Sequence, residues 1–171
     1  MPPDLRIVPT EPRYLDSFRS TLDAVARERQ FLALLEAPAL ERIQHFVGGI
    51  LERGGVQFFA LDKNDQVVGW CDINRHHTEG YRHSGVLGMG LLPDYRGRGI
   101  GTRLAVASIN EARMNGIERI QLTVFASNRN AITLYRKLGF VEEGVRRRAR
   151  LLDGRYDDSV EMALLNSPVI R

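Results

Sequence analysis

Apolar and polar residues alternate along the chain in two rhythms, which predict strands and helices in succession. Short apolar runs rich in β-branched and aromatic residues indicate strands, whereas apolar residues spaced three and four apart indicate helices. Strands are expected at about 5–8, 56–61, 67–74, 82–92, 120–125, 140–150 and 156–164. Helices are expected from 12 to 25, from 38 to the glycines at 54 and 55, from 99 to 115 and from 128 to 138.

The order of these elements predicts one mixed α/β domain covering residues 5–165. Residues 82–125 read strand, helix, strand, and such a unit joins two parallel neighbouring strands by a right-handed crossover. The other strands follow one another through polar turns such as Asp153-Gly154 and should pair antiparallel. We therefore expect a central mixed sheet of about seven strands with about four helices.

Composition narrows the class of protein without giving a function. The 171 residues are 43% hydrophobic and 26% charged, as in an ordinary soluble domain, and no run of about 18 apolar residues indicates a membrane span. The N-terminus has no secretory signal, and the single cysteine, Cys71, lies in an apolar run that favours a packing thiol over a reactive one. These features predict a cytoplasmic location.

The charge pattern argues against a nucleic-acid partner. The net charge is only +3, whereas nucleic-acid binding needs a strong basic patch. The one basic cluster lies at 146–150, and it has two interpretations. It is either a solvated strand or a surface for an anionic substrate, for coenzyme phosphates or for a partner chain.

The segment 96–101, Arg-Gly-Arg-Gly-Ile-Gly, lies between a predicted strand and a predicted helix and has the features of a phosphate site. The first backbone N–H groups of a helix lack intrahelical partners, and the helix dipole makes that end positive. Glycines let the backbone approach a diphosphate, while the two arginines and Thr102 add donors. The alternative is a plain glycine-rich turn.

Two common nucleotide motifs do not fit this segment. A P-loop needs Gly-x4-Gly-Lys-Ser/Thr, and no such run occurs. A dinucleotide fingerprint needs Gly-x-Gly-x-x-Gly, but counted from Gly97 the last position is Thr102. The following strand also ends at 124–127 without the expected acidic residue.

The spacing Arg96-x-x-Gly99-x-Gly101 resembles the pyrophosphate-binding motif of the GNAT superfamily of acyl-CoA-dependent N-acetyltransferases. A second block is similar to the same superfamily: Asn128-x-x-Ala131-x-x-Leu134-Tyr135-x-Lys137-x-Gly139-Phe140. The segment 153–158, Asp-Gly-Arg-Tyr-x-Asp, with Met162, resembles a branch that includes bacterial amino-acid, polyamine and ribosomal-protein N-terminal acetyltransferases. The resemblance spans about 5–165.

The resemblance implies acetyl-CoA as co-substrate and a GNAT fold whose two central parallel strands splay apart. The pantetheine arm would enter the gap, and the backbone at Leu91 and Leu92 would pair with it like an added strand. The implied coenzyme-binding residues are Leu91, Leu92, Arg96, Gly97, Arg98, Gly99, Ile100, Gly101, Thr102, Asn128, Ala131, Tyr135 and Lys137.

Asn128, Ala131 and Tyr135 are spaced to share one helix face. In the family, a tyrosine at the position of Tyr135 donates a proton to the departing CoA thiolate. Reference pKa values of about 10 for tyrosine and about 8.5 for a thiol make that transfer uphill by about 2 kcal/mol, so a hydrogen bond can precede it. The alternatives are a core tyrosine, a simple N-cap at Asn128 and an exposed Lys137.

The acceptor side gives fewer signals. His83 resembles a position where related enzymes carry a base or a substrate contact, and its reference pKa of about 6.5 suits neutral pH. The alternative is a strand histidine that faces solvent, and Asp72 and Glu79 are further candidates for the base. No metal site is expected, because His76 and His77 would point to opposite faces of a strand.

The resemblance thus predicts direct transfer of an acetyl group, in a ternary complex, to the primary amine of a small molecule, with an amino acid as a candidate. One alternative acceptor is a protein N-terminus or lysine. A function of another class is a non-catalytic acyl-CoA sensor. A homodimer is a further expectation from the family, and segments 31–50 and 153–158 should contact the acceptor.

Overall fold

The computed structural model describes residues 5–165, which form a seven-stranded sheet in the order β1-β2-β3-β4-β5-β7-β6. The strands are β1 (Arg6–Pro9), β2 (Val56–Leu61), β3 (Val67–Arg75), β4 (Ser84–Leu91), β5 (Arg119–Phe125), β6 (Val141–Leu152) and β7 (Arg155–Leu165). The α-helices are α1 (Leu15–Arg27), α2 (Leu40–Glu52), α3 (Ile100–Met114) and α4 (Arg129–Lys137). Short 3-10 turns are η1 (Pro12–Tyr14), η2 (Glu79–Tyr81) and η3 (Pro93–Tyr95). The predicted mixed α/β architecture is confirmed.

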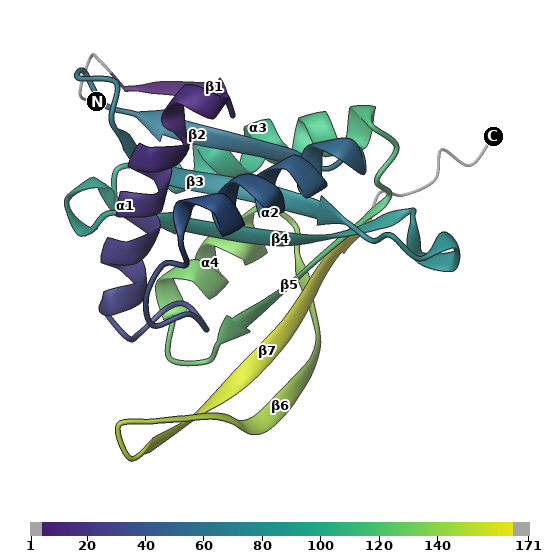
Figure 1. Cartoon of the computed structure of the whole chain (residues 1–171). Coiled ribbons are helices and arrows are strands. Elements are labelled where there is room, and N and C mark those ends of the chain that lie inside the picture. The colour runs from purple at the N-terminus through teal and green to yellow at the C-terminus, as the bar shows by residue number, and fades with distance from the viewer. Residues whose placement is uncertain (1–4, 166–171) are drawn as a thin grey trace.

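Helices cover both faces of the sheet and build two hydrophobic cores. In Figure 1, α1 and α2 lie in front of the sheet, and α3 and α4 lie behind it. The core in front is built around Phe18, Phe59 and Trp70. The larger core behind contains Leu104 and Ile120. No helix among the described residues is long and apolar enough to span a membrane.

The two central strands are parallel and separate from each other, as expected. β4 and β5 pair only at Ser84–Val86 with Arg119–Gln121, while all other neighbouring strands pair antiparallel. β5 instead stays with β7 along its whole length. Figure 1 shows β4 and β5 meeting at one end and diverging toward the other. The second half of β4 therefore has a neighbour on one side only.

The backbone register of β4 decides which of its peptide groups face this gap. The N–H of His76 donates to the Ser84 carbonyl, and the N–H of Leu92 donates to the Val68 carbonyl, so both ends pair with β3 through even-numbered residues. Hydrogen-bonded residues alternate along an antiparallel pair. The odd-numbered residues of the second half, including Met89 and Leu91, therefore direct their N–H and C=O groups into the gap.

Gly90 allows a tryptophan to lie directly against β4. A Cβ at Gly90 would come within 2.3 Å of the Trp70 ring, so any larger residue would displace that ring. Trp70 in turn packs on Phe18 of α1, with ring centroids 5.5 Å apart. This contact connects the front core to the wall of the gap.

Element boundaries differ from the sequence prediction at few places. The strand expected at 82–92 begins at Ser84, because η2 and a following turn take up the residues before it. The final hairpin is longer than expected, and its turn at Asp153-Gly154 has the two positive φ angles, 50° and 73°, of the predicted tight turn. A β-bulge interrupts β6 between Arg146 and Arg150.

Candidate functional site

A cavity of about 1040 Å³ opens where β4 and β5 separate. Its wall includes the segment after α1, the second half of β4, the glycine-rich turn, the end of β5, α4 and the middle of the β6–β7 hairpin. The two sequence blocks that carried the resemblance therefore face one space. The cavity extends from the predicted phosphate site to the hairpin.

The glycine-rich turn presents backbone donors to this cavity. Gly97 and Gly99 both have positive φ, 70° and 76°, a conformation that glycine adopts without strain. The first helical hydrogen bond runs from the N–H of Arg103 to the Gly99 carbonyl, so the N–H groups of residues 100–102 have no intrahelical acceptor. No side chain caps this helix start. The turn is therefore built to bind an anion.

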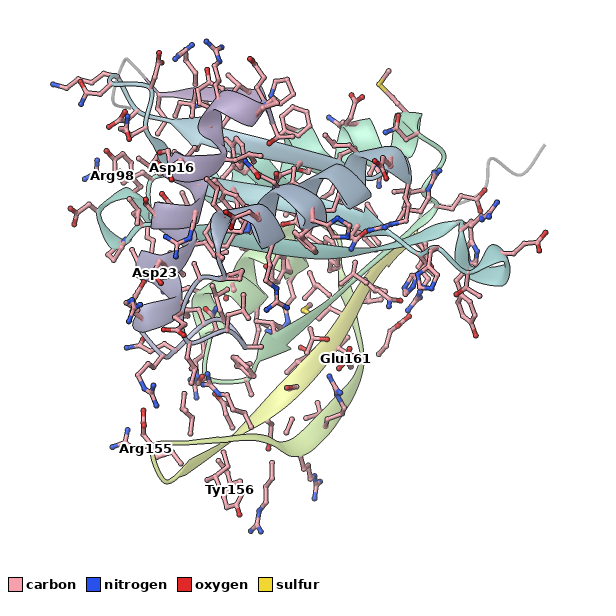
Figure 2. All side chains as sticks on the ribbon, viewed as in Figure 1. Asp16, Asp23, Arg98, Arg155, Tyr156 and Glu161 are labelled. Atoms are coloured by element: carbon pink, nitrogen blue, oxygen red, sulfur yellow. The ribbon has the colours of Figure 1, made fainter. Side chains whose placement is uncertain are left out.

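Arg96 is bound to protein groups rather than free. Its guanidinium donates to both oxygens of the Glu28 carboxylate and twice to the Leu91 carbonyl, which uses four of its five N–H donors. It also lies 4.7 Å from the centre of the Phe31 ring. Arg96 thus fixes the turn against the end of α1. Arg98, by contrast, is exposed, and Figure 2 shows it at the surface of the turn.

Most of the expected coenzyme residues line the cavity, and four do not. Leu92 pairs with β3 through its N–H, so the backbone pairing expected at Leu91 and Leu92 falls instead on Met89 and Leu91. Ile100 is 2% exposed and packs in the core behind the sheet. Arg98 and Lys137 are exposed and outside the wall. The expected residues in the wall are Leu91, Arg96, Gly97, Gly99, Gly101, Thr102, Asn128, Ala131 and Tyr135.

Tyr135 lies on the side of α4 that faces the cavity. The side chain is buried beside Phe140, with ring centroids 5.6 Å apart, so it is a core residue and a wall residue at once. Burial, helped by nearby Cys71, raises the pKa of the Tyr135 hydroxyl well above its usual value. The hydroxyl therefore keeps its proton and acts as a hydrogen-bond donor.

Asn128 combines the two roles that the sequence left open. Its side-chain oxygen accepts a hydrogen bond from the N–H of Ala131 at 3.2 Å and so caps α4. The same residue lines the cavity, with Ala131 one turn further along. Capping thus fixes the side chain where a ligand would pass.

The structure does not bring His83 to this site. His83 is exposed in the turn before β4, and its carbonyl accepts hydrogen bonds from the N–H groups of Glu118 and Arg119. The cavity lies at the other end of β4, around residues 87–91. Glu79, in η2, is also exposed and outside the wall. The geometry therefore gives neither residue access to an amine in the cavity.

The basic cluster of β6 is divided between solvent and the cavity. Arg146 and Arg150 line the cavity, while Arg147 is exposed. Arg150 lies flat on Phe125, 3.8 Å from the ring centre, and donates to the Asp157 carboxylate at 3.2 Å. Its Nε and Nη1 are enclosed and have no hydrogen-bond partner among the described residues. The same-face spacing of Arg146 and Arg150 was the one sequence signal for this arrangement.

Asp72 and Cys71 are neighbouring buried groups on β3. Burial raises the pKa of the Asp72 carboxyl to about 7 and that of the Cys71 thiol to about 12. Cys71 is therefore an uncharged packing residue, as expected. Asp72 stands opposite Gly88 of the cavity wall, and sequence reasoning gave it no preference over Glu79.

The chain is similar to several known proteins over part of their length. The chain is 34% identical over 99 residues to an uncharacterized N-acetyltransferase of Methanocaldococcus jannaschii, covering 56% of this chain and 44% of that protein. It is 29% identical over 115 residues to an L-amino acid N-acetyltransferase of Escherichia coli, covering 67% and 71%. It is 39% identical over 72 residues to a ribosomal protein bS18-alanine N-acetyltransferase of Salmonella typhimurium, covering 42% and 49%. The chain spans about a quarter to three fifths of the length of the first curated relatives it matches.

Solved structures match over nearly the whole chain. A GNAT-family acetyltransferase of Streptococcus pneumoniae superposes with a TM-score of 0.89 at 28% identity, covering 95% of this chain and 100% of that one. A phosphinothricin acetyltransferase of Sinorhizobium meliloti, crystallised with acetyl-CoA, gives a TM-score of 0.88 at 20% identity and covers 95% and 88%. The family model described as "Acetyltransferase (GNAT) family" matches residues 20–140. With its splayed central strands and its anion-binding turn, this chain belongs to the GNAT acetyltransferase family.

Proposed function

We propose that this protein transfers the acetyl group of acetyl-CoA directly to the primary amine of a small amino acid, with both substrates bound at once. The observation that carries the choice of acceptor is the Arg150 guanidinium in the cavity wall. Phe125 and Asp157 hold it in place, yet two of its nitrogens have no partner among the described residues. The Arg150 side chain keeps 19% of its surface accessible at the cavity wall, and a carboxylate matches the guanidinium best among ligands.

On the coenzyme side, the backbone donors at 100–102 would bind the diphosphate, with exposed Arg98 adding charge. The pantetheine arm would pair with the backbone groups of Met89 and the N–H of Leu91, as an added strand does, while the Leu91 carbonyl is held by Arg96. Tyr135 would donate a hydrogen bond to the sulfur as negative charge develops there. Each group binds or orients, and the amine attacks the thioester carbon directly.

A small acceptor is favoured by a link between the end of α1 and the hairpin turn. Arg29, just after α1, donates to both carboxylate oxygens of Asp153 in the hairpin turn, at 3.0 and 2.7 Å. This pair ties the chain just before residues 31–33 of the cavity wall to the hairpin, which would leave less room for a polypeptide. The Escherichia coli relative named for L-amino acids agrees with this choice. The pair is exposed and therefore weak, so it can open.

The second candidate acceptor is a protein N-terminus, and the ribosomal-protein alanine acetyltransferase relative favours it. An N-terminal α-amine and an amino acid present the same reacting group, but only the free amino acid has its carboxylate beside that amine. We also expect a cytoplasmic protein, since its one cysteine is buried and unpaired. Homodimer formation, common in the family, is a further expectation.

The test is an acetyl-CoA consumption screen across L-amino acids, their decarboxylated amines, polyamines, aminoglycosides and peptides with free N-termini. We expect turnover of amino acids above the matched amines. Arg150→Gln should lower kcat/KM for the preferred amino acid by about 10- to 100-fold, because it removes a charge-assisted hydrogen bond, and should leave the matched amine nearly unaffected. Arg147→Gln on the same strand is the control, since Arg147 is exposed and outside the wall.

Preference for peptides over free amino acids would support the second candidate acceptor instead. Equal losses for the amino acid and its decarboxylated amine in Arg150→Gln would show that Arg150 has a structural role only. Binding of acetyl-CoA without turnover of any amine would favour the sensor function.

A further inference from the structure

We propose that Asp72 takes the proton from the attacking amine, through a water molecule in the cavity at Gly88. The inference rests on the proposed transfer of acetyl to an amine, and it holds for either acceptor considered above. It concerns a carboxylate on β3, the strand next to the splayed pair, that is not itself part of the cavity wall.

The wall of the cavity provides no proton acceptor among the described residues. Its ionisable side chains are three arginines and one tyrosine. Arginine stays protonated, and buried Tyr135 keeps its proton. A side-chain base would therefore have to be a carboxylate behind the wall. Four carboxylates close to the wall are engaged: Glu28 pairs with Arg96, Asp157 with Arg150 and Glu161 with Arg146, and Asp158 accepts from the N–H of Arg148.

Asp72 is the carboxylate without such a partner. It makes no hydrogen bond or ion pair with any described side chain, although the residue is only 8% exposed. Neither of its oxygens is among the fully enclosed atoms that lack a partner, so both keep contact with solvent-accessible space. A buried carboxylate without donors destabilises a fold. Its presence is therefore better explained by a chemical role than by packing.

Gly88 is the opening between this carboxylate and the cavity. Gly88 lies directly opposite Asp72 in the β3–β4 register and belongs to the cavity wall. A Cβ placed on Gly88 would be 3.5 Å from each carboxylate oxygen, which is ordinary contact. No side chain therefore stands between the oxygens and the cavity at this position, and a methyl group would fit there and cover them.

Gln57 is the neighbour of Asp72 on the side away from Gly88. It stands opposite Asp72 on β2, and its side-chain nitrogen and oxygen are both enclosed without a hydrogen-bond partner. A water molecule that reaches Asp72 would therefore come from the cavity side at Gly88 and not from the side of Gln57.

The position of Asp72 also matches the direction from which an amine would attack. Consecutive strand residues point to opposite faces of a sheet. Cys71 packs in the core behind the sheet, on the same side as Tyr135 and α3. Asp72 is on the opposite face, with Trp70. Tyr135 would thus contact the leaving sulfur from one side of β4, and Asp72 would accept the proton of the attacking nitrogen from the other.

Burial, rather than a neighbouring charge, sets the pKa of the Asp72 carboxyl. Its neighbours on β2 and β4 are uncharged Gln57 and Gly88. The charged groups of α1 and α2 on this side are engaged or exposed: Arg19 donates to the Pro38 carbonyl, Asp23 pairs with Arg27, Glu28 pairs with Arg96, and Glu41, Arg42, His45, Glu52 and Arg53 are exposed. Burial alone raises the Asp72 pKa to about 7. At neutral pH a large share of the molecules therefore carry the carboxylate form, which can accept a proton.

The neutral amine nitrogen forms a bond to the thioester carbon, and the nitrogen becomes positively charged. One of its protons passes to the bridging water, which gives a proton to the Asp72 carboxylate. The C–S bond then breaks, and the CoA thiolate, hydrogen-bonded by Tyr135, takes one proton from solvent as the Asp72 carboxylic acid releases one.

The test is the pH profile of kcat/KM for Asp72→Asn, measured with the amino acid or peptide that the wild type acetylates best. The wild-type profile should rise through two ionisations, one near pH 7 from Asp72 and one from the amine substrate itself. The variant should be at least 100-fold slower at pH 7 and should keep only the ionisation of the amine, since general-base catalysis contributes about 10²–10⁴. The KM for acetyl-CoA should not change. Asp72→Glu should restore part of the rate, and Gly88→Ala should lower the rate while the carboxylate remains.

A folded Asp72→Asn protein with the wild-type pH profile would overturn the proposal. Failure of the amino-acid hypothesis would be seen separately, as turnover of peptides only. A second measurement needs no acceptor: ¹³C NMR of the Asp72 carboxyl, assigned by Asp72→Asn, should show titration near pH 7 that shifts in Gly88→Ala. A carboxyl that stays ionised from pH 5 to 9 would also overturn the proposal.

Discussion

Tyr135 and Asp72 respond to burial in the same direction, with different chemical results. Burial raises both pKa values, because the charged form of each group loses hydration. For Tyr135 the result is a phenol that keeps its proton at neutral pH and can donate a hydrogen bond. For Asp72 it is a carboxylate that accepts a proton near neutrality. In the proposed reaction the two residues would divide hydrogen-bond donation and proton acceptance between the two faces of the sheet.

Tyr135→Phe should separate binding from chemistry. The ring and its contact with Phe140 remain, so acetyl-CoA affinity should change less than about threefold. Loss of one hydrogen bond to a developing charge should lower kcat by about 10- to 100-fold. Calorimetry and steady-state rates measure the two quantities. An unchanged kcat would mean that the thiolate leaves without help from Tyr135.

Asp72 should also make the fold less stable as pH rises. An unfolded aspartate has a pKa near 3.9 and the folded group about 7, so between these values the unfolded state loses its proton first. Stability is therefore lost through about pH 4–7, on the order of 4 kcal/mol, and stays reduced above pH 7. Denaturant unfolding at pH 5 and pH 8 should show Asp72→Asn gaining on the wild type at pH 8. A constant difference between the two proteins would contradict the raised pKa.

At the scale of elements, local signals were sufficient for the fold. Prolines at 12, 38 and 93 and the glycine at 116 mark element ends in the sequence, and the observed boundaries lie close to them. Arg96 shows the limit of such signals. Its partner Glu28 is 68 positions away, so no local pattern could show that this arginine holds the turn instead of standing free.

The direction and register of β4 explain why His83 and Leu92, which flank this strand, lie outside the cavity wall. A strand rises about 3.3 Å per residue, so the eight-residue β4 has ends about 23 Å apart. His83 precedes the end that pairs with β5, whereas the cavity lies toward the other end. Leu92 is even-numbered, and only odd-numbered residues direct their backbone N–H and C=O groups into the gap. Both facts depend on which strands pair, and the sequence does not contain that information locally.

At the scale of the whole molecule, different parts of the chain line the two sides of the splayed strands. The anion-binding turn and α4 serve one face of the splayed strands, and the segment after α1 and the hairpin serve the other. Figure 2 shows Arg155 and Tyr156 at the far tip of the hairpin, beyond the helices. The motif that identifies the family lies in the glycine-rich turn and α4, while the residues proposed to act on the acceptor come from distant parts of the chain. The coenzyme was therefore predictable from sequence, whereas the sequence offered Asp72 only as one of several base candidates and Arg150 only as part of a basic cluster.

The packing of Trp70 on Gly90 gives the protein a built-in optical reporter. Trp70 is the one tryptophan of the chain, and its ring lies against a residue of the cavity wall. Indole emission responds to changes in its immediate surroundings, so titration with acetyl-CoA should change the fluorescence in a saturable way, without any label. Calorimetric binding with no change in emission would show that the ring does not sense the occupied cavity.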